Sequence, residues 1–197
     1  MFHLMKHLLK IGICADVHQE FTWDACERLS AFVAEMNREN ADFIIQLGDF
    51  CEPHKRNKPF MDVWNSFKGR KFHVIGNHDH DRRKDDYKFI HNYYSPDEIA
   101  AYWNMPAHYY SFNLSNWHFV ILYCHEQKPD CSEKEAYPLY ISKEQLSWLI
   151  DDLNNTDLPV MVFSHPGADV SNGVREGYFL RRILELANEK AGWDNSF

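Results

Sequence analysis

Four short apolar runs that end abruptly in polar residues constrain the fold of this chain more than any other feature. The runs are "KIGICADVH", "DFIIQLGDF", "FHVIGNHD" and "LPVMVFSH". Each is typical of a short buried strand, and each is followed directly by carboxylate, amide or imidazole side chains. In the third run, Gly76 permits a turn that a side chain would hinder.

Helical patterns alternate with these strands in the first part of the chain. Apolar residues recur at helical spacing within residues 22–40, and again in residues 59–68, where Gly69 marks the helix end. Alternating strands and helices of this length predict an α/β fold with parallel strands. In such sheets, sites gather at the carboxyl ends of the strands.

The pattern changes further along the chain. Ser95 and Ser142 each begin a capping box, which predicts two helix starts, and a last amphipathic helix is expected over residues 178–190. Between the two capping boxes, "YYSFNLSNWHFVILY" indicates an antiparallel hairpin that turns at Ser115 and Asn116.

Composition narrows the class of protein. A chain of 197 residues with 45% hydrophobic content fits one globular domain, and a net charge of −8 argues against binding to long nucleic acid. No run has transmembrane length, the amino terminus lacks a signal-peptide core, and the five cysteines show no secreted disulfide pattern. A soluble cytoplasmic protein, with no membrane association, is therefore expected. The cysteines are Cys14, Cys26, Cys51, Cys124 and Cys131.

The residues at the strand ends form a plausible metal-ligand set. They are Asp16, His18, Asp49, Asn77 and His165. Carboxylate, amide and imidazole donors together suit Mn, Fe or Zn better than Ca or Mg. Two ions need a bridging carboxylate, and Asp49 is the natural candidate. Such a centre lowers the pKa of a bound water and holds both the attacking and the leaving oxygen of a displacement at phosphorus. This is the chemistry of phosphoester hydrolysis. Taken singly, each of these residues is more often an ordinary turn or surface residue, and only the joint pattern indicates a site.

The motifs Asp16-x-His18, Gly48-Asp49, Gly76-Asn77-His78-Asp79 and Ser164-His165-x-Gly occur in this order along nearly the whole chain. Together they resemble the calcineurin-like metallophosphoesterase superfamily. Within it, the chain is most similar to the branch of class III cyclic-nucleotide phosphodiesterases and purple-acid-phosphatase-like enzymes.

The resemblance implies a four-layer αββα sandwich with two mixed sheets, formed by one metallophosphoesterase domain over residues 1–197. It assigns Asp16, His18 and Asp49 to one metal, and Asp49, Asn77 and His165 to the other. A metal-bound hydroxide would attack a phosphomonoester or phosphodiester, nucleotides included. His78 would stabilise the phosphoryl oxygens and help to protonate the leaving alcohol.

Three further residues are candidates for contact with a small phosphorylated substrate. His80 and Arg82 follow the third motif, where cations could attract an anion, and His54 follows Asp49 closely. The alternative for each is an ordinary solvated or structural role.

One departure from the superfamily pattern concerns the closing Gly-His-x-His element, because no histidine follows His165. Truncation, ligands donated by another subunit, and a leaner or degenerate site are competing explanations. We expect a domain that lacks its last strands, and an uncovered sheet edge would favour homo-oligomers. The alternative function is a binding or scaffold module, and a nuclease is disfavoured by the acidic charge.

Overall fold

The computed structural model describes residues 8–83, 88, 93–129, 137–168 and 173–190. Cys131 lies outside these ranges, and the other four cysteines are free thiols. The chain divides into two compact units, which are considered one at a time. The first comprises Met1–His73 and His78–Met105, and the second comprises Val74–Asn77 and Pro106–Phe197. One family domain can contain both units, so the expectation of a single domain stays a prediction.

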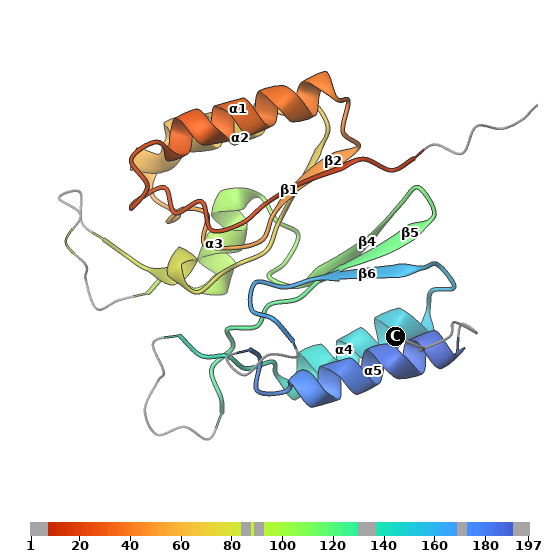
Figure 1. The fold of residues 1–197 in the computed structure, drawn as a ribbon. Coiled ribbons are helices and arrows are strands. Elements are labelled where there is room, and N and C mark those ends of the chain that lie inside the picture. Colours follow the sequence, from red (N-terminus) through yellow and green to blue (C-terminus); the bar gives the residue numbers. More distant parts are fainter. Residues whose placement is uncertain (1–7, 84–87, 89–92, 130–136, 169–172, 191–197) are drawn as a thin grey trace, which may run out of the picture. The chain divides into compact units, whose positions relative to one another are not determined.

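The first unit is built on a parallel sheet. Strands β1 (Ile11–Cys14), β2 (Phe43–Gln46) and β3 (Arg70–His73) lie in the order β1-β2-β3 and pair in parallel. Parallel neighbours need a crossover connection, which helices α1 (Ala25–Arg38) and α2 (Lys58–Asn65) supply. These two helices lie side by side over one face of the sheet (Figure 1).

Close packing and aromatic burial stabilise this unit. A side chain at Gly12 on β1 would collide with Met36 of α1, so the glycine lets the helix approach the strand. Phe50 lies against Phe60 and Trp64 of α2, and all three rings are buried. The described part of the unit also contains the short helix α3 (Pro96–Trp103) and two 3-10 turns, η1 (Lys55–Asn57) and η2 (His78–His80). The capping box that begins at Ser95 is confirmed.

The second unit contains a mixed sheet. Strands β4 (Tyr110–Leu114) and β5 (Trp117–Ile121) form the predicted hairpin, and β6 (Val160–Phe163) pairs in parallel with β5. At the hairpin tip, Ser115 and Asn116 have φ angles of 49° and 66°, the left-handed pair that a two-residue hairpin turn requires.

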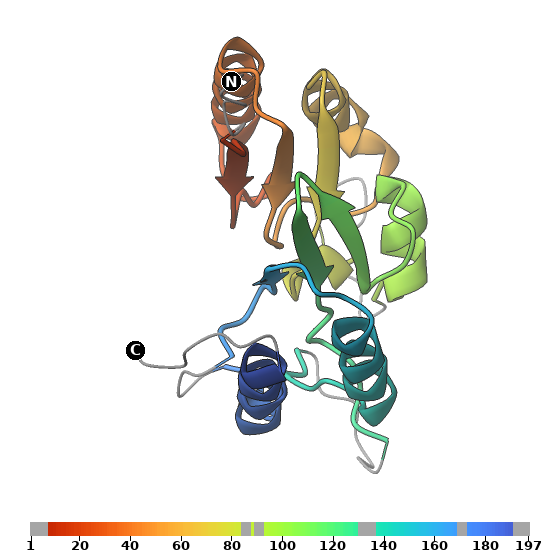
Figure 2. The same ribbon diagram turned by 90° about the vertical axis from the view of Figure 1, so that its right-hand side faces the viewer.

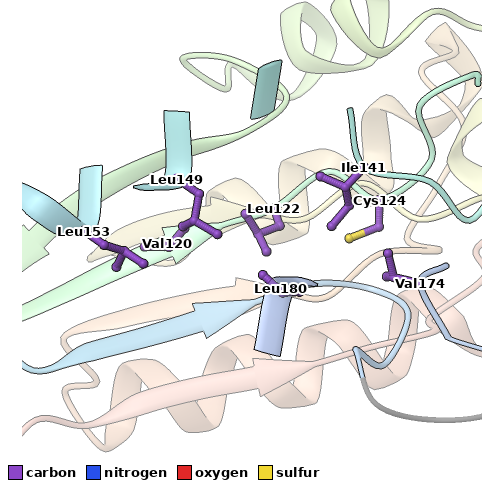
Figure 3. Close-up of a cluster of buried hydrophobic side chains, with 8 residues drawn as sticks. All are labelled: Val120, Leu122, Cys124, Ile141, Leu149, Leu153, Val174 and Leu180. Carbon is purple, nitrogen blue, oxygen red and sulfur yellow. The ribbon is translucent and has the colours of Figure 1, made fainter. Parts of the chain in front are cut away.

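Helices α4 (Lys143–Asn154) and α5 (Gly177–Lys190) lie side by side against this second sheet (Figures 1 and 2). Buried apolar side chains from β5, α4 and α5 meet in one cluster (Figure 3). The cluster consists of Val120, Leu122, Cys124, Ile141, Leu149, Leu153, Val174 and Leu180.

The predicted capping box at Ser142 forms only in part. The Ser142 hydroxyl accepts the Gln145 N–H, but the Gln145 side chain does not return to the helix start. It is fully buried, where its Oε1 accepts the Tyr123 N–H at 3.0 Å and its Nε2 donates to the Tyr123 carbonyl at 2.8 Å. A glutamine side chain that satisfies two buried backbone groups stabilises the fold more than the same side chain would at an exposed helix cap.

The predicted α/β class is confirmed, with two sheets and five α-helices in the described residues. The resemblance implied that both sheets are mixed, whereas the first is parallel over its three described strands. The stacking of the elements into four layers stays a prediction. No helix within the described ranges combines the length and the apolar character needed to cross a membrane.

Candidate metal centre

The carboxyl ends of β1 and β2 are tied together by backbone hydrogen bonds. The Asp16 N–H donates to the Gly48 carbonyl at 3.1 Å, and the His18 N–H donates to the Asp49 carbonyl at 2.9 Å. Parallel pairing ends both strands at the same edge, and these bonds continue the pairing into the loops. The sequence prediction that these polar tips lie together is therefore confirmed for the first unit.

Three of the predicted ligands have left-handed backbone conformations. The φ angles are 52° at Asp16, 49° at His18 and 52° at Asp49. Such angles are uncommon for residues with a side chain and cost free energy unless the surrounding structure fixes them. Their concentration at one strand edge is typical of a functional site rather than of ordinary loops.

Asp49 lies at the middle of this group. Its side chain is only 5% exposed, its Oδ1 accepts the His78 N–H at 2.8 Å, and its Oδ2 lies 3.5 Å from His18 Nε2. His18 Nε2 also lies 3.9 Å from Asp16 Oδ1. Two carboxylates and one imidazole thus present donor atoms to a common point, and this donor set fits a transition metal or zinc.

Asp79 holds the backbone of the loop that carries Asp49. Its two carboxylate oxygens accept the N–H groups of Asp49, at 2.8 Å, and Phe50, at 2.7 Å. The side chain is 1% exposed. The acidic residue of the Gly-Asn-His-Asp motif therefore fixes the direction of a predicted ligand, a role that the motif alone did not reveal.

His78 is oriented by a buried carboxylate. Its Nδ1 lies 2.9 Å from Asp81 Oδ2, and its ring centroid is 5.3 Å from that of His18. The hydrogen bond with Asp81 raises the pKa of His78, the negative charge of Asp49 acts in the same direction, and partial burial opposes both. The side chain is 35% exposed, so the ring can still reach a substrate.

A buried network of charges supports Asp81. Arg83 donates to Asp81 Oδ2 at 2.8 Å and also pairs with Glu52, which pairs with Arg56 as well. Both acidic side chains of the network are 1% exposed. Sequence reasoning missed this network, since no local pattern links Glu52 to a residue 31 positions away.

Asn77 and His165 belong to the second unit. Asn77 follows Gly76 beyond the end of β3, and His165 follows β6 with its ring 5.7 Å from that of His125. Their participation with Asp49 in a second metal site stays a prediction.

The three candidate substrate contacts have different environments. His80 is 9% exposed and its Nδ1 bonds the Tyr94 carbonyl at 2.7 Å, and burial lowers its pKa, which disfavours the charged form. Arg82 donates to Glu98 at 2.8 Å and lies over the Tyr94 ring. His54 accepts the Arg56 N–H at 3.2 Å and so caps η1. Contact with a substrate stays a prediction for all three, and these partners show that each also has a structural role.

Comparison with known proteins identifies the family. The calcineurin-like phosphoesterase family matches residues 9–190. A dimetal phosphatase from Danio rerio has a similar fold, with a TM-score of 0.71 and 16% identity over 90% of this chain and 77% of that one. The anchor GAP50 of the Plasmodium inner membrane complex matches with a TM-score of 0.49 and 16% identity, over 94% of this chain and 64% of its own. No match was found among curated protein sequences.

These findings agree with the motifs and with the geometry of the strand ends. The fold likeness covers most of the chain, and the family match includes every predicted ligand. The chain therefore belongs to the calcineurin-like phosphoesterase family of metal-dependent hydrolases.

Proposed function

We propose that this chain is an active enzyme that hydrolyses a phosphomonoester or phosphodiester, nucleotide esters included, at a dinuclear centre. The observation that carries the proposal is the convergence of His18, Asp49 and His78: the buried Asp49 carboxylate lies 3.5 Å from the His18 imidazole and accepts the backbone N–H of His78, and the two histidine rings lie 5.3 Å apart. A purely structural carboxylate would not need left-handed backbone at Asp49 itself and at both of the neighbouring predicted ligands.

The proposed ligands are Asp16, His18 and Asp49 for one ion and Asp49, Asn77 and His165 for the other, with Mn, Fe or Zn as the candidate metals. Bound ions of this kind would polarise the phosphoryl group and acidify a water. The protein itself contributes the placement of the donors, since Asp79 fixes the loop of Asp49.

His78 is the proposed general acid. Hydrolysis consumes one water and breaks the bond between phosphorus and the ester oxygen, and the departing oxygen needs a proton when it leaves as an alkoxide. The bond from Asp81 orients the His78 ring and favours its protonated form. A protonated imidazole also stabilises negative charge on the phosphoryl oxygens.

Hydrolysis of bis(p-nitrophenyl) phosphate and p-nitrophenyl phosphate with added Mn²⁺ tests the proposal. Asp49→Asn keeps an oxygen that can accept the His78 N–H but removes the charge, so it should abolish turnover and lower the metal content. Asp62→Asn is the matched control, because the Asp62 carboxylate is exposed and pairs with neighbouring Lys58 in α2. Equal turnover in wild type and Asp49→Asn, or none in wild type loaded with metal, would refute an active enzyme and favour a scaffold.

A second comparison tests the role of His78. Nitrophenolate is a good leaving group and departs without a proton, whereas an alkoxide needs a proton from a general acid as it departs. His78→Gln should therefore slow hydrolysis of an alkyl phosphate far more than that of the nitrophenyl ester. Equal slowing of both esters would reject the acid role and leave only charge stabilisation.

A further inference from the structure

We propose that Phe21 is an aromatic platform that selects phosphoesters whose alcohol carries an aromatic ring. This inference rests on the proposed function, because it concerns the alcohol side of the same substrate. Phe21 lies in the loop between β1 and α1, three residues after the predicted ligand His18.

The ring of Phe21 is exposed and yet lies beside the site. It is 60% exposed, and its centroid is 5.7 Å from the His18 ring and 6.1 Å from the His78 ring, both in edge arrangements. A single exposed apolar side chain needs no explanation by itself. What distinguishes Phe21 is its contact with a predicted metal ligand and with the proposed general acid.

The loop holds this ring in a fixed place. The N–H groups of Phe21 and Thr22 both donate to the His18 carbonyl at 2.9 Å. The neighbouring Glu20 side chain accepts the Glu52 N–H at 3.0 Å and also bonds Asn57, which anchors the loop to η1. A ring that is already ordered loses little conformational entropy when a ligand stacks on it.

Arg83 reinforces the position of the ring. Its guanidinium carbon lies 4.5 Å from the Phe21 centroid, a cation–π contact, and the same arginine is held by Asp81. Phe21 is therefore linked, through Arg83 and Asp81, to the residues that orient His78. The exposed part of the ring remains available to a ligand.

The distances indicate which part of a substrate would meet Phe21. A general acid lies within about 3 Å of the oxygen it protonates, so the leaving alcohol must lie next to His78. The Phe21 ring contacts His78, with 6.1 Å between the two ring centroids, so a group held beside His78 also lies close to Phe21. An aryl or nucleobase ring on the alcohol would reach Phe21, whereas a small alkyl group would not.

Binding of two non-hydrolysable probes tests the inference. Phenylphosphonate and methylphosphonate share the phosphonate group and differ in the ring, and calorimetric titration of the Mn²⁺-loaded protein gives both dissociation constants. Wild type should bind phenylphosphonate about tenfold more tightly than methylphosphonate, the effect of one aromatic contact. Phe21→Ala should lose this preference with unchanged affinity for methylphosphonate.

Two further variants make the comparison specific. Phe21→Tyr keeps the ring and should keep the preference, which excludes a general effect of substitution. Trp23→Ala removes another exposed aromatic side chain, 92% exposed, from the same loop and should also keep it. The inference is overturned if wild type has no preference or binds neither probe, or if Phe21→Ala retains the preference or weakens both probes equally. Turnover of nitrophenyl esters by wild type is measured separately. Binding of the probes without turnover would reject the proposed function. The ratio of the two dissociation constants would still decide the role of Phe21.

Discussion

Asp79→Asn is the substitution with the clearest structural consequence. The Asp79 carboxylate accepts two backbone N–H groups, those of Asp49 and Phe50, in a position that is 1% exposed. An asparagine has nearly the same shape but only one acceptor oxygen. Its NH₂ group would face one of the two N–H donors, which would be left buried without an acceptor.

The expected loss of stability follows from these two bonds. A hydrogen bond to a charged acceptor contributes about 1.5–3 kcal/mol, and a buried donor left without a partner costs about 1–3 kcal/mol. One bond survives in weakened form and the other is lost, so the free energy of unfolding should fall by about 3 kcal/mol. For a chain of this size, that corresponds to a decrease in Tm of about 6–12 °C.

Urea denaturation in the presence of a chelator measures this change without a contribution from metal. Asp62→Asn is the control, since its carboxylate is 59% exposed on α2 and its pair with Lys58 should contribute less than about 1 kcal/mol. A decrease below about 1 kcal/mol for Asp79→Asn, close to that of the control, would show that the carboxylate does not fix the loop.

Three further predictions concern stability. Burial and the charge of Lys71 lower the pKa of His73 from 6.5 to about 3. Between these two pH values the unfolded chain binds a proton at His73 and the folded chain does not. The free energy of unfolding should therefore fall by about 1.4 kcal/mol per pH unit as the pH drops from 6.5 toward 3. Unfolding of His73→Gln over the same range should show a slope smaller by this amount, and an unchanged slope would contradict the assignment. Replacing Ser115 and Asn116 by Asn-Gly should raise the free energy of unfolding by about 1 kcal/mol, since glycine adopts left-handed angles without strain, and an unchanged urea midpoint would argue against the turn geometry. Gln145→Leu should lower it by about 2–4 kcal/mol, because two backbone groups of Tyr123 lose their partner, whereas a loss below 1 kcal/mol would mean that water replaces the amide.

Local patterns in the sequence predicted most of the secondary structure. The helical spacing of Leu29 and Val33 predicted α1, and the Ser95 capping box gave the start of α3. The pair Ser115–Asn116 located the hairpin turn. These features depend on residues close in sequence, so the information needed to predict them lies within a short window.

The supports of the site could not be predicted in the same way. Asp79 binds the backbone of Asp49, 30 positions away, and Arg83 pairs with Glu52 across 31 positions. His80 was a candidate for contact with a substrate, with an ordinary solvated role as the alternative, yet it is buried and bonds the Tyr94 carbonyl. Partners so far apart in sequence are brought together only by the tertiary structure. From the sequence alone, a charged residue can be assigned to the surface as easily as to a buried network.

The left-handed backbone at Asp16, His18 and Asp49 has a consequence for protein engineering. Glycine adopts φ angles near 50° without the cost of about 1–2 kcal/mol that a side chain incurs, so glycine at any of these positions would relieve that cost. The same change would remove a donor atom. At Asp49 this relief is offset, because glycine would leave the His78 N–H without its charged acceptor. Directed evolution for heat resistance alone would thus favour glycine at the exposed Asp16, whereas selection for metal retention would preserve the strained residue.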